Sequence, residues 1–117
     1  MRMTETTFDG RLPVDGYGPG FFRIGGQVRR GAVTVLPAGV AGWAGYDDTA
    51  ALIAAAPEID VLFVGTGATM LPLPAAFRQA LEAAGIGVEF MASPAACRSY
   101  NVLLSEGRRI GLAALPV

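Results

Sequence analysis

A single helix is predicted for Ser93-Pro94-Ala95-Ala96-Cys97-Arg98-Ser99-Tyr100-Asn101-Val102-Leu103-Leu104-Ser105-Glu106-Gly107. Ser93 is the expected N-cap, because its hydroxyl can accept a hydrogen bond from an unpaired N–H of the first turn. Pro94 suits the first helical position, where its missing N–H costs nothing. Gly107 suits the left-handed residue that ends a helix. The segment therefore has a defined start and a defined stop.

Apolar runs between turn signals predict the other elements. The Gly25-Gly26 pair indicates a two-residue hairpin turn, and Gly16–Gly20 has the composition of a loop. The continuous apolar run Asp60–Gly65 is typical of a strand that is buried on both faces. Further strands are expected at Phe21–Ile24, Gln27–Arg29, Ala32–Leu36, Gly87–Met91 and Arg109–Leu115, and helices at Ala50–Ala56 and Pro74–Ala84.

This order of elements indicates an α/β fold. Hairpins come first, and strands then alternate with helices, which favours a central mixed sheet with helices packed on it. The acidic pair Asp47-Asp48 with Thr49 is expected to cap the first helix. Because the chain has 117 residues, we predict one domain over 1–117 with an N-terminal hairpin region.

Composition excludes several function classes. Hydrophobic residues make up 52% of the chain, charged residues 16%, and the formal net charge is -1, so nothing indicates a nucleic-acid or membrane-surface binder. With neither His nor Lys, a Ser-His-Asp triad, histidine metal ligands and a Schiff base are excluded. We expect no metal, no cofactor and no classical hydrolase, kinase or dehydrogenase activity.

The N-terminal segment and the single cysteine bear on the cellular compartment. Met1–Phe8 lacks the apolar core of a signal peptide, and no apolar run reaches the length of a membrane span. One Cys cannot form an internal disulfide. These observations predict a protein of a reducing compartment, the cytoplasm in a bacterium.

The Gly65-Thr66-Gly67 motif follows the buried strand. Ligands of open α/β sheets bind at the carboxyl ends of strands, and Gly65 and Gly67 would allow a close backbone approach while Thr66 offers a hydroxyl. The dinucleotide fingerprint is incomplete, because Met70 stands where its third glycine would be. The motif thus indicates either a ligand loop or a tight strand-to-helix connection.

Polar residues of the predicted helix form the second candidate site. Cys97, beside Arg98, would have a lowered pKa if it were exposed near the helix start, whereas a buried Cys97 would only pack. Arg98 and Asn101 lie about one turn apart. Arg98 can face an anion or pair with Glu89 or Asp60 as part of the scaffold, and both interpretations stay open. If the two preceding strands are parallel, the Thr66 loop and this turn lie at the same edge of the sheet.

Aromatic residues in the glycine-rich loops form a third candidate. Tyr17, Phe21 and Trp43 would make a partner-binding patch if they gathered at the surface, since such residues are enriched in interface cores. Alternatively, Trp43 covers the core.

Several motifs together resemble a known family. They are Gly16-Tyr17-Gly18, Phe22-Arg23-Ile24, Gly65-Thr66-Gly67, Gly85-Ile86-Gly87-Val88-Glu89, Ala95-Ala96-Cys97-Arg98-Ser99-Tyr100-Asn101 and Glu106-Gly107-Arg108-Arg109. In this order they are similar to small single-domain proteins of unknown function related to mitochondrial complex I assembly factor 3. The resemblance implies a three-layer α/β domain whose closing strand, Arg109–Leu115, runs antiparallel to its neighbours. It also implies a protein partner, such as an assembly intermediate of a membrane complex.

Two functions remain open at this point. One is a non-enzymatic binding or assembly factor. The other is a small-molecule or anion-binding protein, or an enzyme, whose site combines Gly65, Thr66 and Gly67 with Cys97, Arg98, Tyr100 and Asn101.

Overall fold

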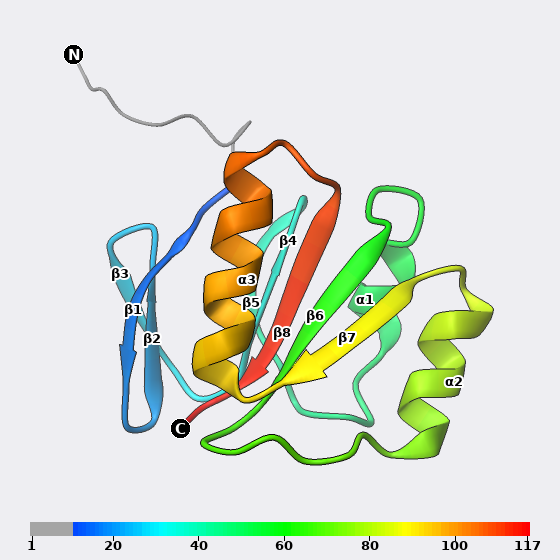
Figure 1. Cartoon of the computed structure of the whole chain (residues 1–117), viewed down its shortest axis with the longest axis horizontal. Helices are drawn as coiled ribbons and strands as arrows, with labels where there is room; N and C mark the ends of the chain where they lie inside the picture. The colour runs from blue at the N-terminus through cyan, green and yellow to red at the C-terminus, as the bar shows by residue number, and fades with distance from the viewer. Residues whose placement is uncertain (1–10) are drawn as a thin grey trace.

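The computed structural model describes residues 11–117; the segment Met1–Phe8 discussed above lies outside them. Within residues 11–117, eleven elements follow one another (Figure 1). They are β1 (Val14–Gly18), β2 (Phe21–Ile24), β3 (Gln27–Arg30), β4 (Val33–Leu36), β5 (Gly39–Gly42), α1 (Ala50–Ala54), β6 (Val61–Thr66), α2 (Ala75–Ala83), β7 (Gly87–Met91), α3 (Ser93–Ser105) and β8 (Ile110–Leu115).

The strands form two sheets. A three-stranded antiparallel sheet has the order β1-β2-β3, and a five-stranded mixed sheet has the order β5-β4-β8-β6-β7. The predicted buried strand is confirmed, because β6 lies between β8 and β7. The resemblance was wrong about β8 in part: β8 is antiparallel to β4 but parallel to β6. α3 returns the chain from the end of β7 to the start of β8, so β8 runs in the same direction as β7 and β6.

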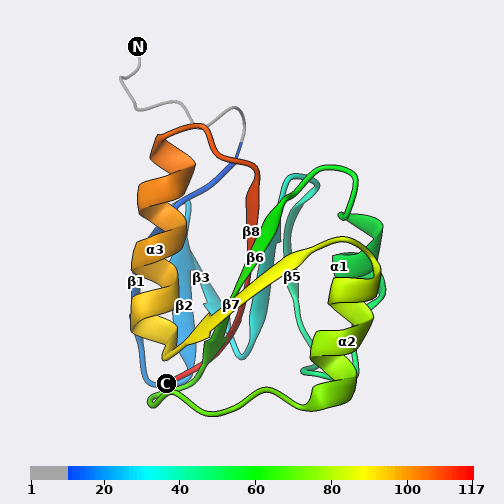
Figure 2. The same cartoon turned by 45° about the vertical axis from the view of Figure 1, so that its right-hand side comes forward.

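Three layers result, with the five-stranded sheet in the middle (Figure 2). On one face, α3 and the three-stranded sheet pack over Phe63 and Leu112. On the other face, α1 and α2 pack over Leu62 and Val64. Because side chains alternate between the two faces of a strand, successive side chains of β6 pack in opposite cores. Both faces of β6 are buried, which explains why its sequence is apolar up to Gly65. The fold class predicted from the sequence is confirmed.

The N-terminal hairpins are longer than the sequence indicates. Gly25 and Gly26 have φ of 56° and 83°, so the two-residue turn between β2 and β3 is confirmed. The prediction of a loop over Gly16–Gly20 was wrong for Gly16–Gly18, which belong to β1 and pair with β2, whereas Pro19 and Gly20 form the turn between the two strands. The residues on either side of Asp15 shift register, and the Asp15 carboxylate accepts a hydrogen bond from Gly26 N. Pairing, rather than β-propensity, therefore forms this strand.

The expected side-chain caps at the helix starts are wrong, α1 ends at Ala54 rather than Ala56, and the predicted end of α3 is confirmed. Ser93 is the first residue of α3 rather than its N-cap, and Thr49 precedes α1 without a side-chain hydrogen bond to it. Asp48 accepts from Ala44 N in the preceding loop instead. Gly107, with φ of 77°, terminates α3 as predicted.

Candidate functional site

The Gly65–Gly67 loop contacts the start of α3 at one edge of the five-stranded sheet. β6 and β7 are parallel, so their carboxyl ends meet there. Gly67 N donates to Ser93 Oγ at 2.9 Å, Ser93 N donates to Gly67 O at 2.8 Å, and Ser93 Oγ donates to Leu115 O at 2.5 Å. Ser93 thus joins the loop, α3 and the end of β8, which explains why its hydroxyl does not cap its own helix.

The hydroxyl of Thr66 organises the loop that follows. It donates to Thr69 O at 2.7 Å, lies 3.2 Å from Met91 O, and accepts from Leu71 N at 3.1 Å. Gly65 has no room for a side chain, because a Cβ there would lie 2.8 Å from the Ser93 Cα. The donors and the hydroxyl of this motif therefore serve a tight strand-to-helix connection inside the fold.

Tyr100 and Asn101 attach α3 to the N-terminal strand. Asn101 Nδ2 donates to Val14 O at 2.7 Å, and its Oδ1 accepts from Val14 N at 2.9 Å. The buried Tyr100 donates through its hydroxyl to Leu12 O at 3.0 Å. Burial raises the pKa of Tyr100 to about 12, against the opposing effect of the nearby Arg11 charge. Both side chains are thereby used in holding the small sheet against the helix.

Cys97 lies in the core between α3 and the sheets. It is 4% exposed, and burial raises the pKa of its thiol to about 11. Desolvation disfavours the thiolate, which is the nucleophilic form. The geometry therefore supports the packing interpretation of this residue.

Arg98 and Val102 face outward between two hollows of the surface. One hollow, of about 250 Å³, lies between α3 and β1 and includes Asp15, Tyr17 and Asn101 in its lining. The other, of about 440 Å³, lies over Phe63 beside Ser99 and Leu103. Within residues 11–117, Arg98 makes no ion pair; Asp60, one of its expected partners, lies 3.4 Å from Arg109 instead. We call Arg98 and Val102 the α3 ridge.

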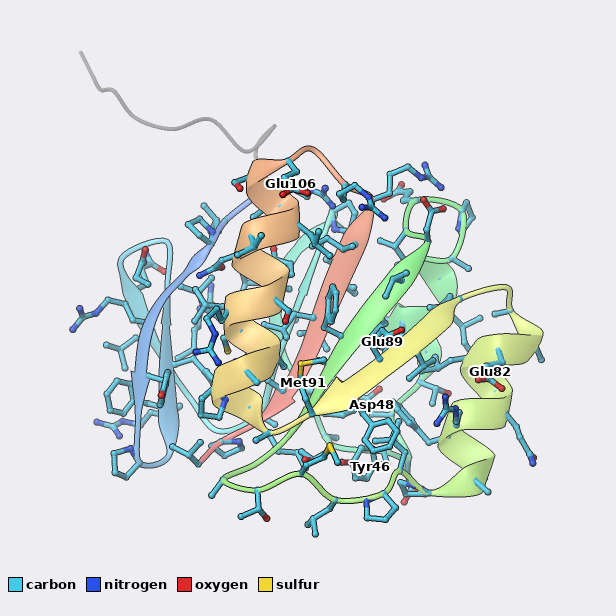
Figure 3. All side chains as sticks on the ribbon, viewed as in Figure 1. Tyr46, Asp48, Glu82, Glu89, Met91 and Glu106 are labelled. Atoms are coloured by element: carbon cyan, nitrogen blue, oxygen red, sulfur yellow. The ribbon has the colours of Figure 1, made fainter. Side chains whose placement is uncertain are left out.

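The second hollow borders the outer strand of the sheet. Ser99 Oγ contacts Met91 Sδ at 3.7 Å, so the end of β7 touches α3. Figure 3 shows Met91 at the end of β7, close to the first turns of α3, and Glu89 nearer the start of the strand. Because Phe63 and Glu89 are paired across β6 and β7, Glu89 is the next residue of the sheet beyond the hollow.

The three aromatic residues of the expected patch do not gather. Trp43 is 6% exposed and lies in the core under α1 and α2, where its ring centroid is 5.9 Å from Phe77. Tyr17 is 47% exposed on β1, and the ring of Phe21 on β2 covers Gly18. Trp43 therefore lies on the opposite side of the sheet from Tyr17 and Phe21.

Comparison with known proteins identifies the family. A family model described as a protein of unknown function (DUF498/DUF598) matches residues 14–115. The chain belongs to this family. An uncharacterised protein of Rhodobacter capsulatus is 50% identical over 117 residues, which are all of this chain and 94% of that protein.

Eukaryotic relatives and a solved structure extend the comparison. The NADH dehydrogenase (ubiquinone) 1 alpha subcomplex assembly factor 3 of Danio rerio is 33% identical over 107 residues, which cover 86% of this chain and 62% of that protein. The structure of a protein described as an outer membrane protein from Bartonella henselae has a TM-score of 0.86 at 34% identity, and covers 95% of this chain and 99% of that one. The resemblance to relatives of assembly factor 3 is thus confirmed.

Residues 11–117 hold neither a cluster of metal ligands nor a membrane-spanning helix. In this part of the chain, no three His, Cys, Asp or Glu side chains lie together as metal ligands. Nor does any helix there have the length and apolar character needed to cross a membrane.

Sequence reasoning missed two residues that build this region. Ser93 was assigned to its own helix, although its hydroxyl bonds the loop and β8. Val14 takes part through its backbone N–H and C=O, which bond Asn101, and every residue type except proline has these groups, so its side chain gives no signal. For the Gly65–Gly67 loop, the sequence did carry a signal: Met70 replaces the third glycine of the dinucleotide motif, which favours a tight connection after β6 over a ligand loop.

Alkylation of Cys97 tests whether its thiol is available for chemistry. We expect iodoacetamide at pH 8 to modify the folded protein at least about 100-fold more slowly than the chain in denaturant, since the pKa is about 11 instead of 9.0 and the sulfur is buried. Because the unfolded chain loses this proton first, the stability should fall as pH rises from 9 toward 11. Equal rates in both states would contradict the buried position.

Proposed function

We propose that this chain is a non-enzymatic binding factor that holds a protein partner during assembly of a membrane-bound respiratory complex. Its family includes proteins named as assembly factors of NADH dehydrogenase. The chain spans about three fifths of the length of the Danio rerio protein. The role is therefore transferred for the shared domain only.

One observation carries this proposal: an exposed surface of mixed character on α3 and β1. Val102 is 51% exposed on α3 and Tyr17 is 47% exposed on β1, and both line the same shallow hollow with Arg98. Tyr and Arg are enriched at interface hot spots, and the exposed Val102 beside them adds apolar area that a partner can bury. By contrast, the thiol and the Thr66 hydroxyl of the expected reactive site are buried or hydrogen-bonded.

Partner recovery from native cells tests this surface. We expect tagged Val102→Glu and Arg98→Glu variants to retain the fold but to recover the specific partner of the unmodified chain about 30-fold less, the loss expected at a hot spot. Ile53→Glu is the matched control, because Ile53 is 39% exposed on α1 at the opposite face. Undiminished recovery with both ridge variants, at unchanged Tm, would reject the α3 ridge as the binding surface.

The same hollow supports a second candidate, the binding of a small anion. Arg98 and Asn101 line it together, and a guanidinium can form two parallel hydrogen bonds to phosphate or carboxylate. Asp15 in the lining opposes an anion, and Gly65, Thr66 and Gly67 do not line it. Titration with inorganic phosphate, followed by NMR, separates the candidates: saturating shifts at Arg98 and Asn101, with those of Asn101 lost in Arg98→Gln, favour the anion.

A further inference from the structure

The outer strand β7 leaves one row of backbone groups without a partner in the described part of the chain. It ends the sheet order β5-β4-β8-β6-β7, and its only strand partner among residues 11–117 is β6. Gly87 N donates to Asp60 O at 2.8 Å, so Gly87 directs its backbone groups toward β6. Because directions alternate along a strand, Glu89 and Met91 do the same, and Val88 and Phe90 point their N–H and C=O outward.

The side chains of β7 alternate between the two faces of the sheet. Val88 and Phe90 pack toward α2, where the Arg78 guanidinium lies 5.5 Å from the centre of the Phe90 ring. Glu89 is exposed on the face of the sheet that α3 partly covers. In Figure 2, β7 runs in front of the sheet with α3 to one side and α2 to the other. The edge therefore offers the N–H and C=O groups of Val88 and Phe90 as two donors and two acceptors. The carboxylate of Glu89, between these two apolar residues in the sequence, adds one negative charge.

We propose that β7 binds an extended segment of another protein as an added antiparallel strand, and that this segment has an apolar–basic–apolar pattern. The outward-facing backbone groups of Val88 and Phe90 would form hydrogen bonds with the backbone of the added strand. These bonds supply affinity without sequence preference. The residue opposite Glu89 lies on the same face at cross-strand distance, where a positive charge is favourable and a negative charge is not. Its two neighbours continue the apolar surface of Val88 and Phe90. This site is separate from the α3 ridge.

Charge argues against a second copy of this chain as the occupant. Two β7 strands paired antiparallel about their centres would place Glu89 opposite Glu89, a destabilising like-charge pair. A charged residue at an edge is a common device against such self-association. The other edge strand, β5, begins and ends with Gly39 and Gly42 and carries no charged side chain that could select a partner.

Titration of the complete 15N-labelled chain with two short peptides tests this proposal. The probes are acetyl-Thr-Val-Arg-Val-Thr-amide and its counterpart with Glu in the central position. We expect the Arg peptide to shift the amide signals of Val88 and Phe90 with a Kd of about 1 mM, and to bind about threefold to fivefold more tightly than the Glu peptide. Glu89→Arg should reverse this preference.

The control variant is Glu106→Arg, which changes an exposed acidic residue at the end of α3 and should leave the preference as it was (Figure 3). Three results would overturn the proposal: no shifts up to several millimolar peptide, shifts centred on residues away from β7, or a preference that Glu89→Arg does not reverse. Concentration-dependent dimerisation through Val88 and Phe90 would also overturn it, since the occupant would then be a second copy.

Discussion

Trp43→Ala should lower the free energy of unfolding by about 3–5 kcal/mol, the usual cost of removing a buried Trp or Phe ring. Trp43 is 6% exposed, its ring centroid lies 5.6 Å from that of Tyr46, and its Nε1 donates to Asp48 O at 3.0 Å. Truncation would leave a cavity between α1, α2 and the sheet. Urea unfolding, followed by far-UV circular dichroism, measures the loss.

Tyr17→Ala is the matched control for this prediction. Tyr17 is 47% exposed, so its truncation should change stability by no more than about 0.5 kcal/mol. The pair of variants separates core from surface among the aromatic residues of the sequence-derived patch. Similar losses from the two would contradict the placement of Trp43 in the core.

Asn101→Ala should destabilise the protein by about 2–4 kcal/mol. The side-chain amide satisfies both the N–H and the C=O of the buried Val14, and each group left without a partner costs about 1–3 kcal/mol. The three-stranded sheet has no strand pairing with the five-stranded sheet, so its position depends on contacts such as this one between β1 and α3. Thermal unfolding gives the total, and amide hydrogen exchange locates it.

Two comparisons sharpen the Asn101 test. Exchange should accelerate in β1 and β2 more than in β6, because the small sheet would open as a local unit. Asn101→Asp keeps the acceptor for Val14 N but sets a carboxylate oxygen against Val14 O, and should therefore also accelerate exchange in those strands. Uniform acceleration across both sheets would mean that the small sheet does not open separately.

Local chemistry determined which parts of the fold could be predicted. The hairpin at Gly25-Gly26, the end of α3 at Gly107 and the strand β6 each depend on residues of the element itself. β1 and β5 are rich in glycine and form because a neighbouring strand pairs with them. Such strands carry little signal of their own, so the sequence indicated a loop over Gly16–Gly20 and no strand over Gly39–Gly42.

The candidate site was predictable in its residues but not in its contacts. The sequence singled out Asn101 and Tyr100, yet their acceptors and donors are backbone groups 87 and 88 positions away in the chain. The parallel strands that this prediction assumed are present, and they bring the Thr66 loop to Ser93, one turn before the predicted neighbour Cys97–Asn101. Whether Cys97 packs or reacts depends on its exposure, which a single sequence does not reveal.

The position of β8 has a consequence for how the chain folds as it leaves the ribosome. β8 follows every other strand in the chain but lies in the middle of the larger sheet, between β4 and β6. Until it is synthesised, the β4–β5 hairpin and the β6–α2–β7 unit have no shared strand, and apolar edges of both stay open. At about 5–20 residues per second, this interval lasts seconds. During it the nascent chain is exposed to aggregation, and chaperones have their main opportunity to bind it.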